Sequence, residues 1–347
     1  CGASRTACTG LMQRSRPVFR SPASLVANMG ALSRVSRAPI YLVGDILQAG
    51  RDAAAELLDR LRIARLPNEI VFEFLDLPPE SFLRDIDRNV RRWGMEISPE
   101  THDPALRQAL DGEPSYDNAK LEAVLAEALR LRRRRIDVFF MIGLPGQPRA
   151  SVMDTVDYCE RLLGLGDARL GCYISPMGPF LDPGSRGFDD PERYGYRMFA
   201  RTLEEHRQLL VQPTWEHILN YDTRWMTRRE LVDATYDAAE GLNALKQRHR
   251  RIPQRQARAV ARRIAAARAL RARLDAVNES GATVPDDLLG DIRRYSVSTV
   301  CDKRELFGAD HLLALRPFGL ARLAFDALRR PVPNRPGRRR HEPVQQS

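Results

Sequence analysis

Short apolar segments of the chain are followed by small or charged residues, and these residues are the candidates for chemistry. The first segment ends in Gly44 and Asp45, where the glycine permits close backbone approach and the carboxylate can face a cation. Glu96 lies within the third segment and Ser98 follows it, and polar residues that alternate at the end of a strand serve as caps and ligand contacts. The fourth segment ends at Gly143, in a glycine-bearing turn that runs into a helix. We therefore expect a ligand to bind at these turns.

Several common site signatures are absent from the same turns. The turn after the fourth segment lacks the Lys and Ser/Thr of a P-loop, and no G-x-G-x-x-G stretch occurs, so neither nucleotide fingerprint is present. His102 with Glu96 and Glu100 could suggest a metal site, although caps and ligand contacts are the more common role of such residues. Ser98, His102 and Asp103 do not make a catalytic triad from proximity in sequence alone.

The apolar segments are predicted strands, and helical sequence separates them. The five runs are Ile40–Val43, Ile70–Leu75, Met95–Ile97, Ile136–Ile142 and Leu170–Ile174. Helices are expected at Arg51–Ala64, after an N-cap at Asp117, and after a capping box formed by Ser151 and Asp154. Because strands and helices alternate, we predict an α/β fold with a parallel sheet, as an open barrel with its function at the carboxyl ends of the strands.

The strands are expected to stop after about residue 190, where a helical C-terminal region begins. Its predicted helices are Tyr194–Leu210, Thr227–His249, Arg255–Val277 and Asp310–Leu328, and Thr227 and Glu230 have the spacing of a second capping box. The last segment, 329–347, is broken by prolines and lacks periodicity, so we expect a disordered basic tail. The predicted organisation is therefore 1–190, 191–328 and 329–347.

The net charge of +10 over 347 residues comes from two segments. Residues 248–274 hold ten arginines and no acid, and the tail adds six arginines against one glutamate, so the rest of the chain is mildly acidic. An amphipathic helix with a solvated arginine face is the favoured reading of 248–274. An RNA-binding or RNA-modifying protein remains an alternative, although no aromatic residues interleave these arginines and no nucleic-acid-binding motif appears.

The cysteines and the lack of long apolar runs indicate the compartment in which the protein is expected. Five cysteines, none in a C-x-x-C pair, fit a reducing compartment. No apolar run approaches the length that a membrane-spanning helix needs. We expect a cytoplasmic protein without a membrane partner.

Three segments together resemble one family. PIYLVGDILQAG, MEISPETHDPALRQAL and DVFFMIGLPGQPRASVMDTVDYCE are similar to radical S-adenosylmethionine (SAM) enzymes, in the branch that carries an upstream cobalamin-binding domain. The opening CGASRTAC is similar to the end of the family's C-x-x-x-C-x-x-C cluster motif, which makes Cys1 its third cysteine. The resemblance covers about residues 1–180. It implies a partial TIM-like radical SAM barrel that lacks its first strand, in an N-terminally truncated fragment.

The resemblance also implies roles for the residues at the strand ends. Cys1 would be a ligand of a [4Fe-4S] cluster. Gly44 and Asp45 match the motif that binds the methionine amino group, while Glu96 and Ser98 match the position that contacts the ribose or the sulfonium side.

A further match to the family is the strand and turn around Ile142 and Gly143, which resembles the segment that lies along adenine. Pro99 replaces a glycine common in relatives, which is a departure in the loop path.

The implied cofactors are the [4Fe-4S] cluster and SAM, with cobalamin bound through an upstream domain. The family uses them to generate a 5′-deoxyadenosyl radical or to support cobalamin-dependent radical chemistry. An electron donor such as flavodoxin or ferredoxin would be a partner, and the substrate is unknown. With one cluster cysteine this chain alone should be inactive. A cluster-free α/β barrel enzyme, using Asp45, Glu96 and His102 in acid–base catalysis, stays open as an alternative.

Overall fold

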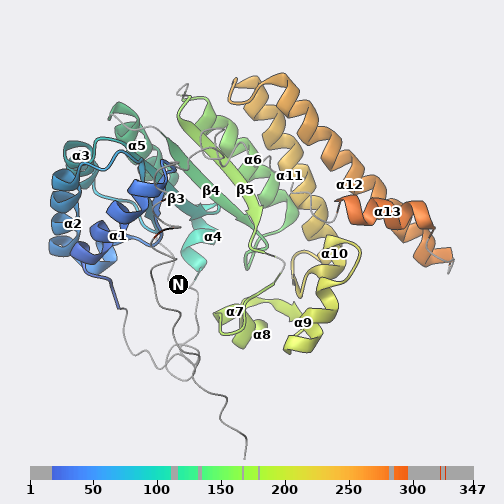
Figure 1. The fold of residues 1–347 in the computed structure, drawn as a ribbon. Helices are drawn as coiled ribbons and strands as arrows, with labels where there is room; N and C mark the ends of the chain where they lie inside the picture. Colours follow the sequence, from blue (N-terminus) through green and yellow to red (C-terminus); the bar gives the residue numbers. More distant parts are fainter. Residues whose placement is uncertain are drawn as a thin grey trace, which may run out of the picture.

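The computed structural model describes residues 18–110, 116–131, 135–165, 168–178, 180–280 and 285–295, with Ala321 and Phe325. A five-stranded parallel sheet forms the centre of this part of the chain (Figure 1). Its strands are β1 (Ile40–Leu42), β2 (Ile70–Phe74), β3 (Trp93–Glu100), β4 (Ile136–Ile142) and β5 (Leu170–Pro176). The predicted strands are therefore confirmed.

The strands lie in the sheet in the order in which they occur in the chain, from β1 to β5. Each crossover thus advances by one strand in one direction, as in (β/α) barrels, and the order never reverses as it does in doubly wound sheets. Among the described residues the sheet is open, with β1 and β5 at its edges.

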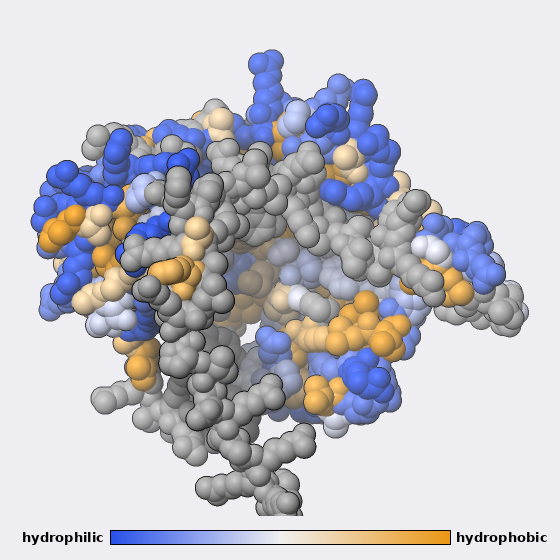
Figure 2. Space-filling model, in the orientation of Figure 1, coloured by the Kyte–Doolittle hydropathy of each residue, from blue (hydrophilic) through white to orange (hydrophobic). Residues whose placement is uncertain are grey.

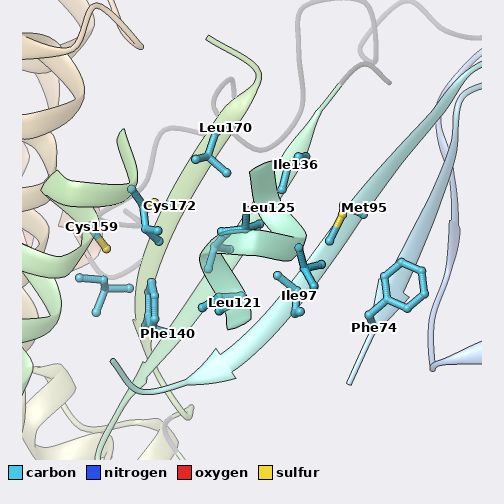
Figure 3. Packing of buried hydrophobic residues seen from close by; sticks show 14 of the residues in the cluster. Phe74, Met95, Ile97, Leu121, Leu125, Ile136, Phe140, Cys159, Leu170 and Cys172 are labelled. Atoms are coloured by element: carbon cyan, nitrogen blue, oxygen red, sulfur yellow. The ribbon is translucent and has the colours of Figure 1, made fainter. Parts of the chain in front are cut away.

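The first part of the chain supplies helices between the strands. Their bounds are α1 (Pro22–Val35), the 3₁₀ helix η2 (Ile46–Ala49), α2 (Arg51–Ala64), α3 (Glu80–Asn89), α4 (Pro104–Ala109), α5 (Asn118–Arg130) and α6 (Arg149–Leu163). One face of the sheet packs on this layer: Met95 and Ile97 of β3 are fully buried and lie near Leu121 and Leu125 of α5 (Figure 3). The alternate residues of each strand consequently project from the second face.

In the first part of the chain, one predicted helix cap is right and one is wrong. Asp117 caps α5 as expected, and its carboxylate accepts the N–H of Lys120 at 2.7 Å. The predicted capping box at Ser151 is wrong, because α6 already begins at Arg149 and Ser151 lies inside it, buried against the fold. Pro148 precedes the first turn instead, without a side-chain cap.

The C-terminal region is not purely helical, which corrects the prediction that strands stop near residue 190. Strands β6 (Tyr196–Met198) and β7 (Tyr221–Thr223) pair antiparallel in a second sheet. The predicted helix Tyr194–Leu210 accordingly begins only at Leu203, because β6 takes its first part. The helices here are α7 (Arg186–Asp189), α8 (Pro191–Tyr194), α9 (Leu203–Leu210), α10 (Trp215–Ile218), α11 (Arg228–Arg248), α12 (Gln254–Ser280) and α13 (Asp286–Tyr295).

The two long helices of this region match their predictions closely, including the capping box of Thr227 and Glu230 at the start of α11. The predicted helix Asp310–Leu328 lies outside the described residues apart from Ala321 and Phe325, and the tail 329–347 lies outside them entirely. Within the described part of the chain, no helix combines the length and the apolar character that crossing a membrane requires.

Candidate functional site

The carboxyl ends of the strands bring three of the predicted segments to one edge of the sheet. Gly44 follows β1, Ser98 lies in the last part of β3, and Gly143 follows β4. Because all five strands are parallel, these positions share the edge where α/β proteins place their ligand sites. The edge is therefore the candidate site.

The loop after β1 is anchored on the neighbouring strand. Gly44 has φ +92°, a conformation that glycine adopts at little cost, and its N–H donates to the carboxylate of Glu73 in β2. A Cβ at Gly44 would meet nothing within 4 Å, so the backbone angle, and not space, calls for glycine here.

Asp45 is turned into its own loop. It is 6% exposed and caps η2, and its Oδ1 accepts the N–H of Leu47 at 2.8 Å. Burial raises the pKa of Asp45, and the backbone N–H groups of Leu47, Leu75 and Asp76 oppose that rise. The carboxylate thus already holds the loop in place.

A row of three carboxylates crosses the second face of the sheet. Glu73, Glu96 and Asp137 are register partners on β2, β3 and β4. Asp137 is buried and forms an ion pair with Arg135. Burial, with a further contribution from the charges of Asp137 and Glu73, raises the pKa of Glu96 to about 7 against the opposing effect of Arg135. Glu96 therefore exchanges a proton near neutral pH.

Glu96 and Ser98 have side chains that are free to bind a ligand. Both project from the second face of β3, two residues apart, and both are half-buried. Among the described residues neither side chain has a hydrogen-bond partner. A carboxyl group and a hydroxyl group so placed can bind hydroxyl or cationic groups of a ligand.

The loop beyond Ser98 follows a bulge. The β3–β4 register shifts between Ile97 and Glu100, and Glu100 has φ +62°. The fully buried Arg107 holds this path: it donates to the carbonyl oxygens of Pro99 at 3.0 Å and Thr101 at 2.7 Å. The proline that departs from the family pattern therefore lies in a bulge fixed by a buried guanidinium.

The turn after β4 is closed by Gln147, which is completely buried. Its Oε1 accepts the N–H groups of Gly143 at 2.9 Å and Leu144 at 3.3 Å, and its Nε2 donates to the carbonyl of Met141 at 3.0 Å. The carbonyl of Gly143 accepts the hydroxyl of Tyr196 at 3.0 Å. Both backbone groups of Gly143 are thus engaged within the chain.

Ile142 points to the helix layer and is 1% exposed, while its carbonyl accepts the N–H of Met177 at 3.2 Å. Phe139 and Met141 project from the second face instead, and Phe139 stacks on Tyr173 with ring centroids 4.9 Å apart. The apolar surface that β4 offers on that face is therefore made by Phe139 and Met141.

His102 lies against α6, beside Tyr158 at 6.4 Å between ring centroids. The hydroxyl of Thr155 donates to the carbonyl of Ser151, so it must accept from His102, whose Nδ1 lies 2.9 Å away. Nδ1 therefore carries the proton and Nε2 has the lone pair, and burial lowers the pKa of His102.

Asp45, Glu96 and His102 do not form one acid–base group. Asp45 is held by the loop next to β2, Glu96 lies between Glu73 and Asp137, and His102 bonds to Thr155 of α6. No described contact links any two of the three residues.

The cluster ligands cannot be placed on the described part of the chain. Cys1 lies outside the described residues, and among those residues no group of three or more His, Cys, Asp or Glu side chains is arranged to hold a metal ion. Cys159 and Cys172 are fully buried in the core between α6 and β5 (Figure 3).

Some residues around the site were not predicted from the sequence. Asp137 belongs to the row of carboxylates, and Arg135 and the Phe139–Tyr173 stack border it. Lys246 of α11 places its Nζ 4.3 Å from the ring centroid of Tyr173. A signal exists for Asp137 alone, which is an acid inside an otherwise apolar strand.

Comparisons with known proteins give no relative by sequence: no family model and no curated protein matches. Among solved structures, the chain resembles the radical SAM methyltransferase TsrM from Kitasatospora setae with cobalamin and a [4Fe-4S] cluster bound. The TM-score is 0.47 at 15% identity, over 71% of this chain and 49% of that one. A second TsrM structure, with tryptophan and the SAM analogue aza-SAM, gives 0.47 at 16%, over 71% and 50%.

A third similar structure is the coproporphyrinogen III oxidase HemN from Escherichia coli, with a TM-score of 0.33 at 15% identity, over 61% of this chain and 57% of that one. The chain thus spans about half the length of the structures that it matches. Each of these structures is a radical SAM enzyme of low sequence identity to this chain.

Proposed function

We propose that this chain is part of a radical SAM enzyme that acts on a small molecule or another substrate not yet identified. The observation that carries the proposal is the pair Glu96 and Ser98, which lie unpartnered on the second face of β3 in the segment that resembles the family. Gly44 and the Gly143 turn lie at the same edge of the sheet, which further supports the assignment.

The residues present fit SAM in part. The hydroxyl of Ser98 and the carboxyl of Glu96 can hydrogen-bond to ribose hydroxyls, and Phe139 and Met141 can contact a planar base. Asp45 and Gly143 already use the groups that the family resemblance implied for ligand binding, so their part is to fix the loops. When bound, SAM and a cluster would supply the radical chemistry.

The described residues do not supply the cluster ligands, so the cluster and cobalamin would be held outside the described part of the chain. An electron donor such as flavodoxin or ferredoxin is proposed as the partner. Within this chain, Glu73 positions the Gly44 loop, and Glu96, whose pKa is about 7, can accept or release a proton beside the ligand.

The test is anaerobic iron–sulfide reconstitution of the full-length protein, followed by calorimetry with SAM. We expect Glu96→Ala to weaken SAM binding about tenfold or more and Ser98→Ala by a smaller factor, since charge-assisted hydrogen bonds are the stronger ones. The exposed Glu279 and Ser81 give matched controls, Glu279→Ala and Ser81→Ala. A colourless protein that is active without a cluster, or unchanged SAM affinity in both site variants, would overturn the proposal.

The contacts of α12 favour the interpretation of residues 248–274 as an amphipathic helix rather than as an RNA-binding surface. Arg268 and Arg271 pair with Asp237 and Asp233 of α11, at 2.6 and 2.5 Å, so part of its charge is used in helix packing. RNA binding therefore gains no specific observation here.

A further inference from the structure

A cleft opens at the edge of the sheet opposite the candidate site. It lies where α2 and α3 end, beside Ile70, the first residue of β2, and has a volume of about 380 Å³. Figure 2 shows hydrophilic and apolar residues side by side over α2 and α3, at the left of the view. Because β2 runs from Ile70 towards Phe74, the cleft is at the amino ends of the strands.

Four arginines line this cleft, and two of them have no acceptor. Arg65 and Arg91 are exposed, and neither side chain has a hydrogen-bond or ion-pair partner among the described residues. Among the described residues, Arg62 and Arg88 pair with aspartates on their own helices, three residues away and exposed to solvent. Such surface pairs stabilise the fold little, so an anion can compete for these guanidinium groups.

One carboxylate also lines the cleft, but it is already used. Asp87 accepts the indole N–H of Trp93 at 3.0 Å, and this hydrogen bond holds the carboxylate against the start of β3. The last carbonyl groups of α2 and α3 also face this end, and those of Leu61 and Ile86 accept the N–H groups of Arg65 and Val90. Because aspartates already pair with Arg62 and Arg88, the excess positive charge around the opening comes from Arg65 and Arg91, and Asp87 offsets part of it.

The rest of the lining is apolar. Leu61, Ile70 and Val90 are buried beneath the opening, and Leu66 is half-buried at its side. A ligand for this cleft therefore needs an anionic end for the arginines and an apolar body for the floor. Arginine binds both carboxylate and phosphate groups in a bidentate manner. A phosphate monoester carries the higher negative charge at neutral pH, so it gains more from two guanidinium groups than a carboxylate does.

The surrounding charge favours the same kind of ligand. An arginine closely precedes every strand of the sheet: Arg37, Arg65, Arg92, Arg135 and Arg169. Since the amino ends of parallel strands meet at one edge, these residues lie along the edge that holds the cleft, where Arg65 lines the cleft itself and Arg135 is paired with Asp137. Clustered positive charge raises the local concentration of anions.

We propose that the cleft between α2 and α3 binds a phosphate monoester with an apolar body, whose phosphate is held by Arg65 and Arg91. This site is separate from the candidate site at the carboxyl ends of the strands, so a test of this proposal does not depend on the proposed radical SAM function.

The test is calorimetry of the full chain with phenyl phosphate and with inorganic phosphate as probes. Arg65→Gln/Arg91→Gln should weaken phenyl phosphate binding about tenfold or more, because two charge-assisted contacts are lost. The matched control is Arg255→Gln/Arg258→Gln, which removes two exposed arginines of α12 that also lack described partners. We expect this control to change the affinity less than about twofold.

A second variant tests the apolar part of the site. Leu66→Ala should weaken phenyl phosphate binding and leave the affinity for inorganic phosphate unchanged, with thermal unfolding confirming that the variant is folded. Equal losses in the cleft variant and the α12 control would mean that net charge alone attracts the probe, and would overturn the proposal. Far tighter binding of single-stranded RNA through the same arginines would also overturn it, in favour of a nucleic-acid surface.

Discussion

The backbone N–H of Gly44 donates a hydrogen bond to the carboxylate of Glu73, so a loop at the candidate site is held by the adjacent strand. Glu73 is also the register partner of Glu96 and contributes to the raised pKa of that residue. One side chain thus links the position of the Gly44 loop to the protonation of Glu96.

Replacing Glu73 should affect both properties in the same variant. In Glu73→Ala the Gly44 N–H loses its acceptor, and the free energy of unfolding should fall by about 1–3 kcal/mol. The pKa of Glu96 should fall, because a nearby negative charge is removed. Carboxyl titration by NMR measures the second effect. Glu73→Gln keeps an acceptor for Gly44 and removes the charge, so it should lower the pKa of Glu96 with a smaller loss of stability.

Glu96 makes the stability of the fold depend on pH. Its pKa is about 7 in the folded chain and 4.5 in an ordinary environment, so the folded state binds more protons between these values. Stability should therefore fall as the pH rises from about 4.5 to 7, by on the order of 2 kcal/mol after allowance for solvent screening.

Urea unfolding at pH 5 and pH 8 measures this dependence, and Glu96→Gln should reduce it. The control Glu279→Gln alters an exposed carboxylate at the end of α12 and should leave it unchanged. If Glu96→Gln and wild type lose the same stability between the two pH values, Glu96 is not the group responsible.

Patterns within short stretches of sequence are sufficient to predict the five strands of the sheet and the starts of two helices, because apolar runs and helix caps are local properties. Asp117 and the Thr227–Glu230 box are cases of this kind. The capping box predicted at Ser151 was wrong because the same spacing also occurs inside a helix, and α6 begins two residues earlier, at Arg149. Strand β6 was missed because three residues pair with β7, more than 20 residues further along the chain, and such short pairing leaves little pattern.

For the candidate site, too, some features follow from local sequence and others do not. Its location follows from the strand ends, but the partners of its groups depend on contacts between distant segments. Gly143 is engaged by Tyr196, which is 53 residues away, and Asp45 is turned inward by its own loop. Local sequence therefore placed the candidate residues at the strand ends and overestimated how many of their groups are free.

Gln147 should be essential for the turn after β4. Gln147→Ala leaves two buried N–H groups and one carbonyl without their side-chain partner, so we expect a loss of about 2–4 kcal/mol in the free energy of unfolding. Denaturant unfolding measures this loss. Gln48 is exposed and its side chain has no described partner, so Gln48→Ala should change stability by less than about 0.5 kcal/mol. A similar effect in both variants would contradict the role given to Gln147.

Arg107 should determine the path of the chain after Ser98. Its guanidinium donates to four oxygens, including those of Pro99 and Tyr116, and a lysine ammonium cannot reach all of them from one position. Arg107→Lys should therefore lower the free energy of unfolding by about 3 kcal/mol or more, since buried acceptors lose their donors. The exposed Arg60, in an i,i+4 pair with Glu56, is the control, and Arg60→Lys should have little effect.

The same variant distinguishes a general loss of stability from a local change at the site. Amide hydrogen exchange should increase most in the segment from Ser98 to Thr101, where Arg107 holds the bulge, and little in α2, which connects β1 and β2. Uniform acceleration across the sheet would mean that Arg107 stabilises the whole core. A local increase would assign Arg107 to positioning Ser98, because the bulge then loosens while the strands that carry it remain intact.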